Sequence, residues 1–334
     1  MTLSGKFRMR TKNLGRNGPV VPALGLGCMG MSDFYGPADE NESIATIQAA
    51  LDAGVNLLDT GDFYGMGHNE MLIGRALRDR RHQAFIAVKF GALRGPDNAW
   101  GGFDLRPAAL KNFLAYTLRR LGTDYVDLYQ PCRIDPSCPI EDTIGAIADL
   151  VKAGWVRHIG LSEAGPANIR KAAAVHPIAA LQIEYSLVTR GIEAAILPVV
   201  RELGIGVTAY GVLSRGLLSG ARPSSPKDFR GHFPRFAGPN LESNQHVVAA
   251  LRDIAAKHNA TAPQIAIAWV LSRGEDIIPI LGARRRDQFH ETLGALQLRL
   301  TPADLAEIES TVPPVSGTRY GADQMNWLDS EKNT

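Results

Sequence analysis

The stretch that decides the fold runs Pro107-Ala-Ala-Leu-Lys-Asn-Phe-Leu-Ala-Tyr-Thr-Leu-Arg-Arg-Leu-Gly-Thr-Asp-Tyr-Val-Asp-Leu-Tyr129. Its first part, Pro107–Leu121, has the pattern of an amphipathic helix, and Gly122 is a helix stop signal. The apolar run Tyr125–Tyr129 that follows predicts a strand. The unit is therefore a helix that leads through a short turn into a strand.

The same alternation of helix and strand repeats along the chain. Eight strands are predicted, at Ala23–Gly27, Leu57–Asp59, Phe85–Val88, Tyr125–Tyr129, Val156–Leu161, Leu181–Ile183, Gly206–Tyr210 and Asp276–Leu281. The predicted helices between and around them are Asn41–Ala53, Glu70–Leu77, Pro107–Leu121, Ile140–Ala153, Ala167–Ala174, Ile192–Leu203, Gln245–His258 and Pro263–Ser272. Strands that alternate with helices form parallel sheets, and eight such units indicate closure. We therefore expect an α/β protein with one (β/α)₈ TIM-barrel domain over residues 1–334.

Two further segments lie outside this alternation. Met9–Pro22, with a turn at Gly15–Gly18, predicts a β-hairpin that caps the N-terminal mouth, the bottom, of the barrel. Arg222–Pro239 is rich in proline and glycine and is the longest segment without periodicity. It is either a surface linker or a loop at the catalytic mouth that closes over a bound cofactor. We favour the loop, because long loops in compact domains are usually functional or disordered.

The composition is that of an ordinary globular protein. The 334 residues are 45% hydrophobic and 21% charged, and the net charge of +2 implies no bulk attraction to nucleic acid or to an anionic membrane. The three cysteines form no disulfide framework, and Cys132 and Cys138 lack the paired spacing of a zinc site. Met1–Arg10 has no apolar core, and no stretch approaches the roughly 18 apolar residues of a spanning helix. We expect a cytoplasmic protein without nucleic-acid, membrane or metal partners, with Ser330–Thr334 as a frayed end.

A short glycine motif near the N-terminus invites a different interpretation. Gly25-Leu26-Gly27-Cys28-Met29-Gly30 matches the G-x-G-x-x-G pattern of dinucleotide-binding folds. That pattern needs a helix that opens directly at the glycines. Met31–Glu40, which contains Gly36 and Pro37, predicts a loop instead. The glycines more simply allow the first strand to approach a ligand closely.

Three polar residues at the ends of neighbouring strands carry the predicted chemistry. Asp59 ends one predicted strand, Tyr64 follows five residues later in the loop, and Lys89 ends the next strand. Side chains at the C-terminal ends of barrel strands converge on one face, so these three could meet. Each also has a structural interpretation, as a cap, a packed ring and an outward-pointing ammonium group.

Such a trio suits carbonyl reduction. Hydride addition to a carbonyl carbon builds negative charge on the oxygen, which then needs a proton. A tyrosine phenol has a pKa of about 10, and a neighbouring lysine lowers that pKa by stabilising the phenolate. A buried lysine needs a counter-ion, which Asp59 can supply.

At this point the sequence resembles the aldo-keto reductase family, over about Asn13 to Leu305. The motifs that carry the resemblance are Leu58–Gly65, Leu118–Tyr125, Gly154–Glu163, Gln182–Leu187 and Gly282–Ala295. The resemblance implies an oxidoreductase in which Tyr64 donates the proton and Asp59 and Lys89 tune it. It also implies that NADPH binds in an extended form across the top of the barrel, with NADH the less favoured cofactor.

One residue departs from the family pattern. The fourth catalytic residue of the family is a histidine just before Arg-x-Asp-Pro, and this chain has Cys132 there, in Gln130-Pro131-Cys132-Arg133-Ile134-Asp135-Pro136. A thiol is smaller and a weaker donor than imidazole. We expect a slower reductase or one with altered substrate choice. The alternatives are a low-pKa thiol with its own role and a cofactor-binding regulatory or sensor subunit with weak catalysis.

The resemblance also implies the cofactor contacts. They are Ser162, Glu163 and Gln182 for the nicotinamide carboxamide; Tyr210 as the ring that stacks on the nicotinamide; Gly211, Leu213, Ser214, Arg215 and Gly216 for the pyrophosphate; and Gly282, Ala283, Arg284, Arg285, Gln288, Glu291 and Thr292 for the adenosine end. The run Arg284–Arg286 can pair with a 2′-phosphate. Ala283, Gln288 and Thr292 differ from the residues common in the family, which makes the preference for NADPH less strict.

The substrate pocket is the least defined part of the prediction. Trp100, in the Gly95–Gly102 loop, and Tyr35 are the candidate substrate-binding residues for a small carbonyl compound. His158, within a predicted strand, is interpreted as a core or lining residue. The sequence indicates neither the substrate nor the oligomeric state.

Overall fold

Eight parallel strands close into a barrel in the computed structural model, which describes residues 9–32, 34–223 and 228–332. The strands, in the order in which they neighbour one another, are β3 (Gly25–Gly27), β4 (Leu57–Gly61), β5 (Phe85–Phe90), β8 (Val126–Pro131), β9 (Val156–Ser162), β10 (Ile178–Glu184), β11 (Gly206–Tyr210) and β12 (Ile277–Gly282). Every pair is parallel, and β12 pairs with β3 to complete the ring. The predicted (β/α)₈ barrel is confirmed.

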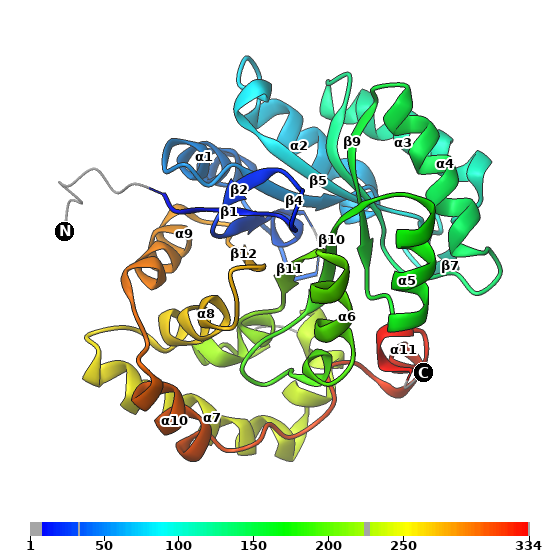
Figure 1. Cartoon of the computed structure of the whole chain (residues 1–334). Helices are drawn as coiled ribbons and strands as arrows, with labels where there is room; N and C mark the ends of the chain where they lie inside the picture. Colours follow the sequence, from blue (N-terminus) through cyan, green and yellow to red (C-terminus); the bar gives the residue numbers. More distant parts are fainter. Residues whose placement is uncertain (1–8, 33, 224–227, 333–334) are drawn as a thin grey trace.

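Helices surround the barrel and separate its strands (Figure 1). They are α1 (Glu40–Asp52), α2 (His68–Ala76), α3 (Pro107–Leu121), α4 (Ile140–Lys152), α5 (Pro166–Val175), α6 (Ile196–Leu203), α7 (Gly238–Lys257), α8 (Ala262–Ser272) and α9 (Arg286–Leu293), followed by α10 (Pro302–Thr311) and α11 (Ala322–Asn326). Helix α3 ends as predicted, because Gly122 adopts the left-handed conformation (φ 65°) in which glycine is unstrained. None of the helices in the described ranges is long and apolar enough to cross a membrane.

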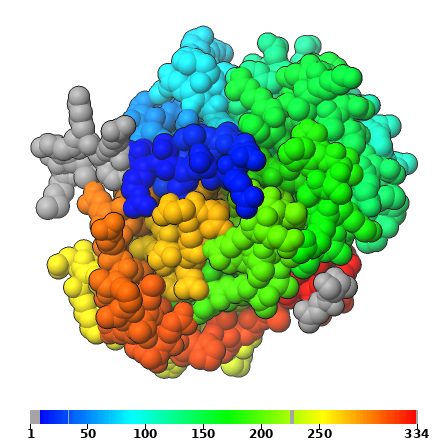
Figure 2. All heavy atoms as spheres, in the orientation of Figure 1, coloured from blue at the N-terminus to red at the C-terminus, as the bar shows by residue number. Residues whose placement is uncertain are grey.

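The N-terminal hairpin closes the bottom of the barrel, as predicted. It consists of β1 (Thr11–Asn13) and β2 (Val20–Pro22), which are antiparallel. Leu14 and Val21 from the hairpin join a buried cluster with side chains from inside the barrel, among them Leu57 and Leu128. The Lys12 ammonium group donates to the carbonyl of Ile277, where β12 begins, at 3.1 Å. In Figures 1 and 2 the hairpin is the blue band that crosses the face of the barrel turned toward the viewer. The opposite end of the barrel is therefore the open one.

Three sequence expectations about segments outside the barrel are corrected. The Gly95–Gly102 region is not simply a loop, because β6 (Ala92–Arg94) pairs with β7 (Trp100–Phe103). Helix α7 begins at Gly238 rather than at residue 245, since Pro239 is tolerated in the first helical turn. The C-terminal segment is not simply frayed at residue 330, because Ser330 donates a hydrogen bond to Glu163.

Parts of four sequence expectations lie outside the described residues. They are residues 1–8 of the N-terminal segment, residue 33 of the loop predicted after the glycine motif, residues 224–227 of the predicted mouth loop, and residues 333–334 of the predicted frayed end. The rest of the glycine-motif prediction stands, because only the short 3₁₀ turn Met29–Met31 follows β3 and helix α1 begins later, at Glu40.

Candidate active site

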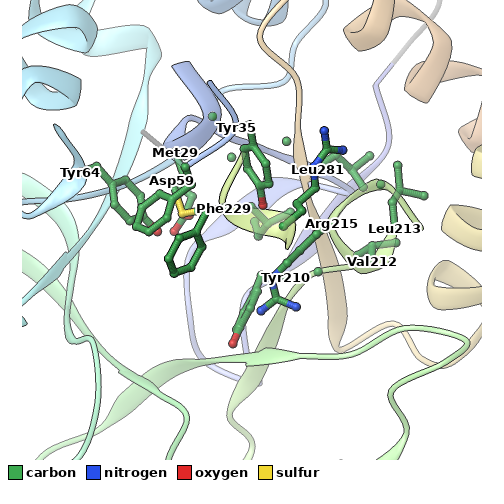
Figure 3. Close-up of a pocket in the computed structure, with 18 of the residues that line it drawn as sticks. Met29, Tyr35, Asp59, Tyr64, Tyr210, Val212, Leu213, Arg215, Phe229 and Leu281 are labelled. Atoms are coloured by element: carbon green, nitrogen blue, oxygen red, sulfur yellow. The ribbon is translucent and has the colours of Figure 1, made fainter. Parts of the chain in front are cut away.

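The main cavity lies at the C-terminal ends of the barrel strands and has a volume of about 440 Å³. This size is typical of small-molecule and cofactor sites. Figure 3 shows Asp59 and Tyr64 on one side of the view and Arg215 and Leu213 on the other. The cavity lies opposite the hairpin, at the end where TIM-barrel enzymes carry their active sites.

Asp59 and Lys89 form a buried ion pair on one wall of this cavity. The Lys89 Nζ atom lies 2.7 Å from Oδ1 and 2.8 Å from Oδ2 of Asp59. Strands β4 and β5 set this contact, because Gly61 pairs with Lys89 and Asp59 with Ala87 in their register. Gln182 also donates to Asp59 Oδ1 at 2.6 Å. The carboxylate is therefore held from two sides.

Tyr64 lies next to this ion pair. The Lys89 Nζ atom is 5.1 Å from the centre of the Tyr64 ring. Tyr64 begins a short 3₁₀ segment in which Gly65 (φ 54°) and Met66 (φ 52°) take left-handed conformations, and this tight turn carries the phenol back over the strand ends. The structure thus brings the three predicted residues together.

The pKa of Tyr64 differs from the expectation drawn from its lysine neighbour. Burial raises the pKa of the Tyr64 phenol well above its usual value, the negative charge of Asp59 raises it further, and Arg133 opposes the rise. The main physical reason is that burial disfavours the charged phenolate, while the charge of Lys89 is paired with Asp59. Tyr64 is therefore a fully protonated acid across the physiological range.

Cys132 directly follows β8, is buried and lines the cavity. Its backbone N–H donates to the carbonyl of Phe90 at 2.9 Å, which fixes its position beside β5. Burial is the main cause that raises the pKa of the Cys132 thiol to about 12. The alternative of a low-pKa, reactive thiol is therefore wrong. Cys28 and Cys138 are also buried, and no cysteine forms a disulfide.

The predicted carboxamide-binding residues lie together at the ends of β9 and β10. Ser162 and Gln182 line the cavity. The Ser162 hydroxyl is buried and has no hydrogen-bond partner within the described residues. Because buried polar groups are normally satisfied, this hydroxyl fits a ligand amide. The described part of the chain contains no cluster of three His, Cys, Asp or Glu side chains that could hold a metal ion.

Glu163 is tied to the C-terminal segment instead of facing the cavity. Both of its carboxylate oxygens accept from Arg319, at 2.9 and 2.7 Å. The Tyr210 hydroxyl donates to Glu163 at 2.7 Å and lies 3.2 Å from the Tyr320 hydroxyl. Arg319 and Tyr320 were not predicted from the sequence. The only signal was that a carboxylate buried at a strand end requires a cation.

The residues predicted for the pyrophosphate and adenosine ends mostly line the same cavity. These are Gly211, Leu213, Arg215, Gly216, Gly282, Ala283, Arg284, Gln288, Glu291 and Thr292, and Tyr210, predicted to stack on the nicotinamide, lines the cavity as well. Ser214 and Arg285 are not part of the lining. Of the arginine run, Arg284 reaches the cavity and donates to the carbonyl of Tyr35 at 2.8 Å, whereas Arg285 pairs with Asp287 and Arg286 with Glu42.

Aromatic side chains form the wall next to Tyr64. Phe34 stacks on Trp100, with ring centres 6.2 Å apart, and lies edge-on to Tyr64. Tyr35 lines the cavity, as does Phe229 from the predicted mouth loop. This places the described part of that loop at the catalytic mouth. His158 lies elsewhere, stacked on Phe85.

Comparison with known proteins identifies relatives over most of the chain. The sequence model described as the aldo/keto reductase family matches residues 23–313. A curated relative named "Probable aldo-keto reductase 1", from Glycine max, is 42% identical over 326 residues, which cover 94% of this chain and 93% of that protein.

Solved structures with the same barrel have related sequences. A glycerol dehydrogenase from Gluconobacter oxydans is 29% identical, with a TM-score of 0.82 over 92% of this chain and 98% of that one. A thermostable aldo-keto reductase in complex with the inhibitor epalrestat is 32% identical, with a TM-score of 0.73 over 91% and 100% of the two chains. The holo form of an aldo-keto reductase from Bacillus halodurans is 27% identical, with a TM-score of 0.76 over 97% and 100%.

Proposed function

The chain belongs to the aldo/keto reductase family, whose members are NAD(P)H-dependent oxidoreductases, and on that premise we propose that it reduces an aldehyde or ketone with NADPH, with Tyr64 as the proton donor. The observation that carries the proposal is the contact between Tyr64 and the Asp59–Lys89 ion pair on the cavity wall. The reaction is reversible, and the same groups would serve alcohol oxidation.

The residues around the cavity fit a nicotinamide cofactor. Ser162 offers a buried hydroxyl without a partner, and Tyr210 offers a flat ring for stacking. Arg284 reaches the far part of the cavity, where it could pair with a 2′-phosphate. The bound cofactor would supply the hydride that adds to the carbonyl carbon. These contacts support NADPH over NADH.

The protein's own contribution is to place and hold one proton. Tyr64 keeps its proton until the carbonyl oxygen becomes an alkoxide, which is a stronger base than a phenolate. The phenolate that remains lies beside the Lys89 ammonium group, which has three N–H donors. Two of these donors reach Asp59, and the ammonium group lies 5.1 Å from the centre of the Tyr64 ring, so its charge would stabilise the phenolate. Asp59 keeps Lys89 charged and fixed in position.

Cys132 reduces the number of hydrogen bonds available to the carbonyl oxygen. Its thiol is buried and protonated and is a weak donor. One lost hydrogen bond is worth about 1–3 kcal/mol, which corresponds to a rate roughly 5- to 150-fold lower. The enzyme is therefore expected to be slower than a relative with histidine at this position.

The proposed function is tested by comparing the wild type with Tyr64→Phe in an NADPH-oxidation assay over a panel of aldehydes. We expect the wild type to oxidise NADPH and the variant to lose at least about 100-fold in kcat, since general-acid catalysis contributes roughly 10²–10⁴-fold. NADPH binding, followed by fluorescence, should be unchanged. If NADPH binds tightly but no carbonyl is reduced, the chain is a cofactor-binding regulator and the proposal fails.

A further inference from the structure

The cavity wall carries several cations, and they differ in their partners. Lys89 pairs with Asp59, Arg215 with Glu184, and Arg230 with Asp228. Arg133 also lines the cavity, yet it forms no ion pair within the described residues. Its guanidinium group donates to the carbonyl of Cys132 at 2.6 Å. A guanidinium has five N–H donors, so most of those on Arg133 have no protein acceptor in the described part of the chain.

Arg133 lines the same cavity as Tyr64 and Tyr210. It is the residue after Cys132, at the end of β8. Burial raises the pKa of both Tyr64 and Tyr210, and the positive charge of Arg133 opposes that rise in each, so the guanidinium acts electrostatically on both the proton donor and the ring expected to stack on the nicotinamide. Because Tyr64, Cys132 and Arg133 line one cavity, a carbonyl compound held at Tyr64 would share that cavity with the Arg133 guanidinium.

The nearest acidic candidate does not neutralise this charge. Glu163 acts on Arg133 through space, since its charge raises the pKa of Arg133. However, both Glu163 oxygens are already bonded to Arg319, and one also accepts from Tyr210. The ion pair with Arg319 leaves Arg133 with a charge that no carboxylate of the described residues pairs directly. Arg133 is partly buried, and a partly buried charge is costly unless a ligand supplies the counter-ion.

We propose that Arg133 binds a carboxylate on the carbonyl substrate, so that the enzyme prefers oxo acids to neutral aldehydes and ketones of the same shape. This inference rests on the proposed reductase function and names its substrate class. The planar fork of a guanidinium matches the two oxygens of a carboxylate. Because Arg133 occupies the strand end next to Cys132, it also orients the substrate where the family histidine is missing.

The test uses ω-oxo acids of four to six carbons, each compared with its own methyl ester. Ester formation removes the charge and keeps the aldehyde and the chain. We expect the wild type to have a higher kcat/KM for at least one acid than for its ester. Arg133→Gln should lower the acid-to-ester ratio of kcat/KM by about 10- to 100-fold, the range for a hydrogen bond to a charged group. Arg133→Lys should retain part of the preference for the acid, with an acid-to-ester ratio between those of the wild type and Arg133→Gln.

A matched control removes the same charge from the surface. Arg106 is exposed and pairs with Asp104 outside the cavity. Arg106→Gln should leave the acid-to-ester ratio unchanged, so an effect of net charge alone would appear in both variants. If Arg133→Gln raises the KM for NADPH while the ratio stays constant, the guanidinium serves the cofactor and the inference is overturned.

A second measurement does not depend on turnover. Butanoate should bind the wild-type NADPH complex, with butanamide at least about tenfold weaker, as followed by cofactor fluorescence. Equal binding of the two would overturn the role of Arg133, even if Arg133→Gln does not fold. Failure of the reductase proposal is distinguished because it would abolish reduction of the methyl esters as well as of the acids.

Discussion

Arg319 and Glu163 are 156 positions apart in the sequence, yet the two guanidinium nitrogens of Arg319 bond both carboxylate oxygens of Glu163 at 2.9 and 2.7 Å. Ser330 and Glu331 add further bonds to this pair. The segment after the family match, which ends at residue 313, is therefore fastened to the end of β9.

Breaking this pair should destabilise the protein strongly. Arg319→Met leaves the Glu163 carboxylate buried without its cation, and the loss of one partner of a buried ion pair costs about 3–5 kcal/mol. Denaturant unfolding should show this loss, and the double variant Arg319→Met with Glu163→Gln should recover part of it. The control Arg170→Met breaks an exposed pair with Glu202 and should have a smaller effect. Equal effects of the two single variants would contradict the prediction.

The carboxyl group of Asp62 should make the protein less stable as pH rises. Burial, and then the charge of Glu70, raises the pKa of Asp62 to about 8 in the folded state, above its ordinary value of 3.8. Between pH ~4 and pH ~8 the Asp62 carboxyl group is therefore ionised in the unfolded chain and protonated in the folded chain. The contribution of Asp62 to the free energy of unfolding is therefore complete below pH ~4. It falls by up to about 1.4 kcal/mol per pH unit until pH ~8.

Asp62→Asn removes this titration. The difference in unfolding free energy between the variant and the wild type should therefore move in favour of the variant from pH 5 to pH 8. Guanidinium denaturation at several pH values measures this difference. Asp149→Asn, at an exposed site on α4, is the control and should show no such trend. A difference that does not change with pH would rule out a raised pKa for Asp62.

The three cysteines should resist alkylation in the folded protein. The thiolate is the reactive form, and burial raises the pKa of Cys132 to about 12 and that of Cys28 higher still. We expect N-ethylmaleimide at pH 7.5 to label the native protein slowly and all three thiols rapidly in denaturant, as counted by mass spectrometry. Rapid labelling of Cys132 in the native state would contradict its burial.

Replacing Cys132 with histidine should raise turnover. Cys132→His restores a stronger hydrogen-bond donor near the carbonyl oxygen, and we expect kcat on simple aldehydes to rise by up to roughly 100-fold. Cys132→Ala is the comparison, because it removes the thiol without adding a donor. If the kcat of Cys132→His does not exceed that of Cys132→Ala, no hydrogen-bond donor was missing at this strand end.

Arg284 should determine the cofactor preference. It reaches the cavity, whereas Arg286 is occupied by Glu42. We expect Arg284→Gln to raise the KM for NADPH by about tenfold, the loss of one charged hydrogen bond, and to leave the KM for NADH nearly unchanged. Arg286→Gln should alter neither value. Equal changes for both cofactors would mean that Arg284 does not bind the 2′-phosphate.

Regular patterns made the barrel predictable. Parallel strands that are covered on both faces are nearly continuous apolar runs, and every run after the first is preceded here by a helix, one of which ends at the stop signal Gly122. All five residues of β4 are buried, for example. The meeting of Asp59 and Lys89 was also predictable, because strand order and register place both at one end of the barrel.

Contacts made by the C-terminal segment could not be predicted in this way. Arg319 reaches Glu163 through irregular chain, and no sequence periodicity connects the two. The pKa of Tyr64 was misjudged for a related reason. The sequence placed a lysine near the phenol, but the extent of burial and the pairing of Lys89 with Asp59 depend on three-dimensional packing. The β6–β7 hairpin was missed because both strands are short and β7 contains two glycines, Gly101 and Gly102.

The reacting groups and the walls around them come from different kinds of structure. Lys89 and Asp59 are held by the hydrogen-bond ladder of adjacent strands, whereas Phe34, Trp100 and Phe229 come from connecting segments. Connecting segments tolerate insertion and exchange far better than strands do. Swapping these segments between homologues should thus create enzymes with new selectivity and unchanged chemistry. The chain is accordingly a suitable scaffold for directed evolution of biocatalysts.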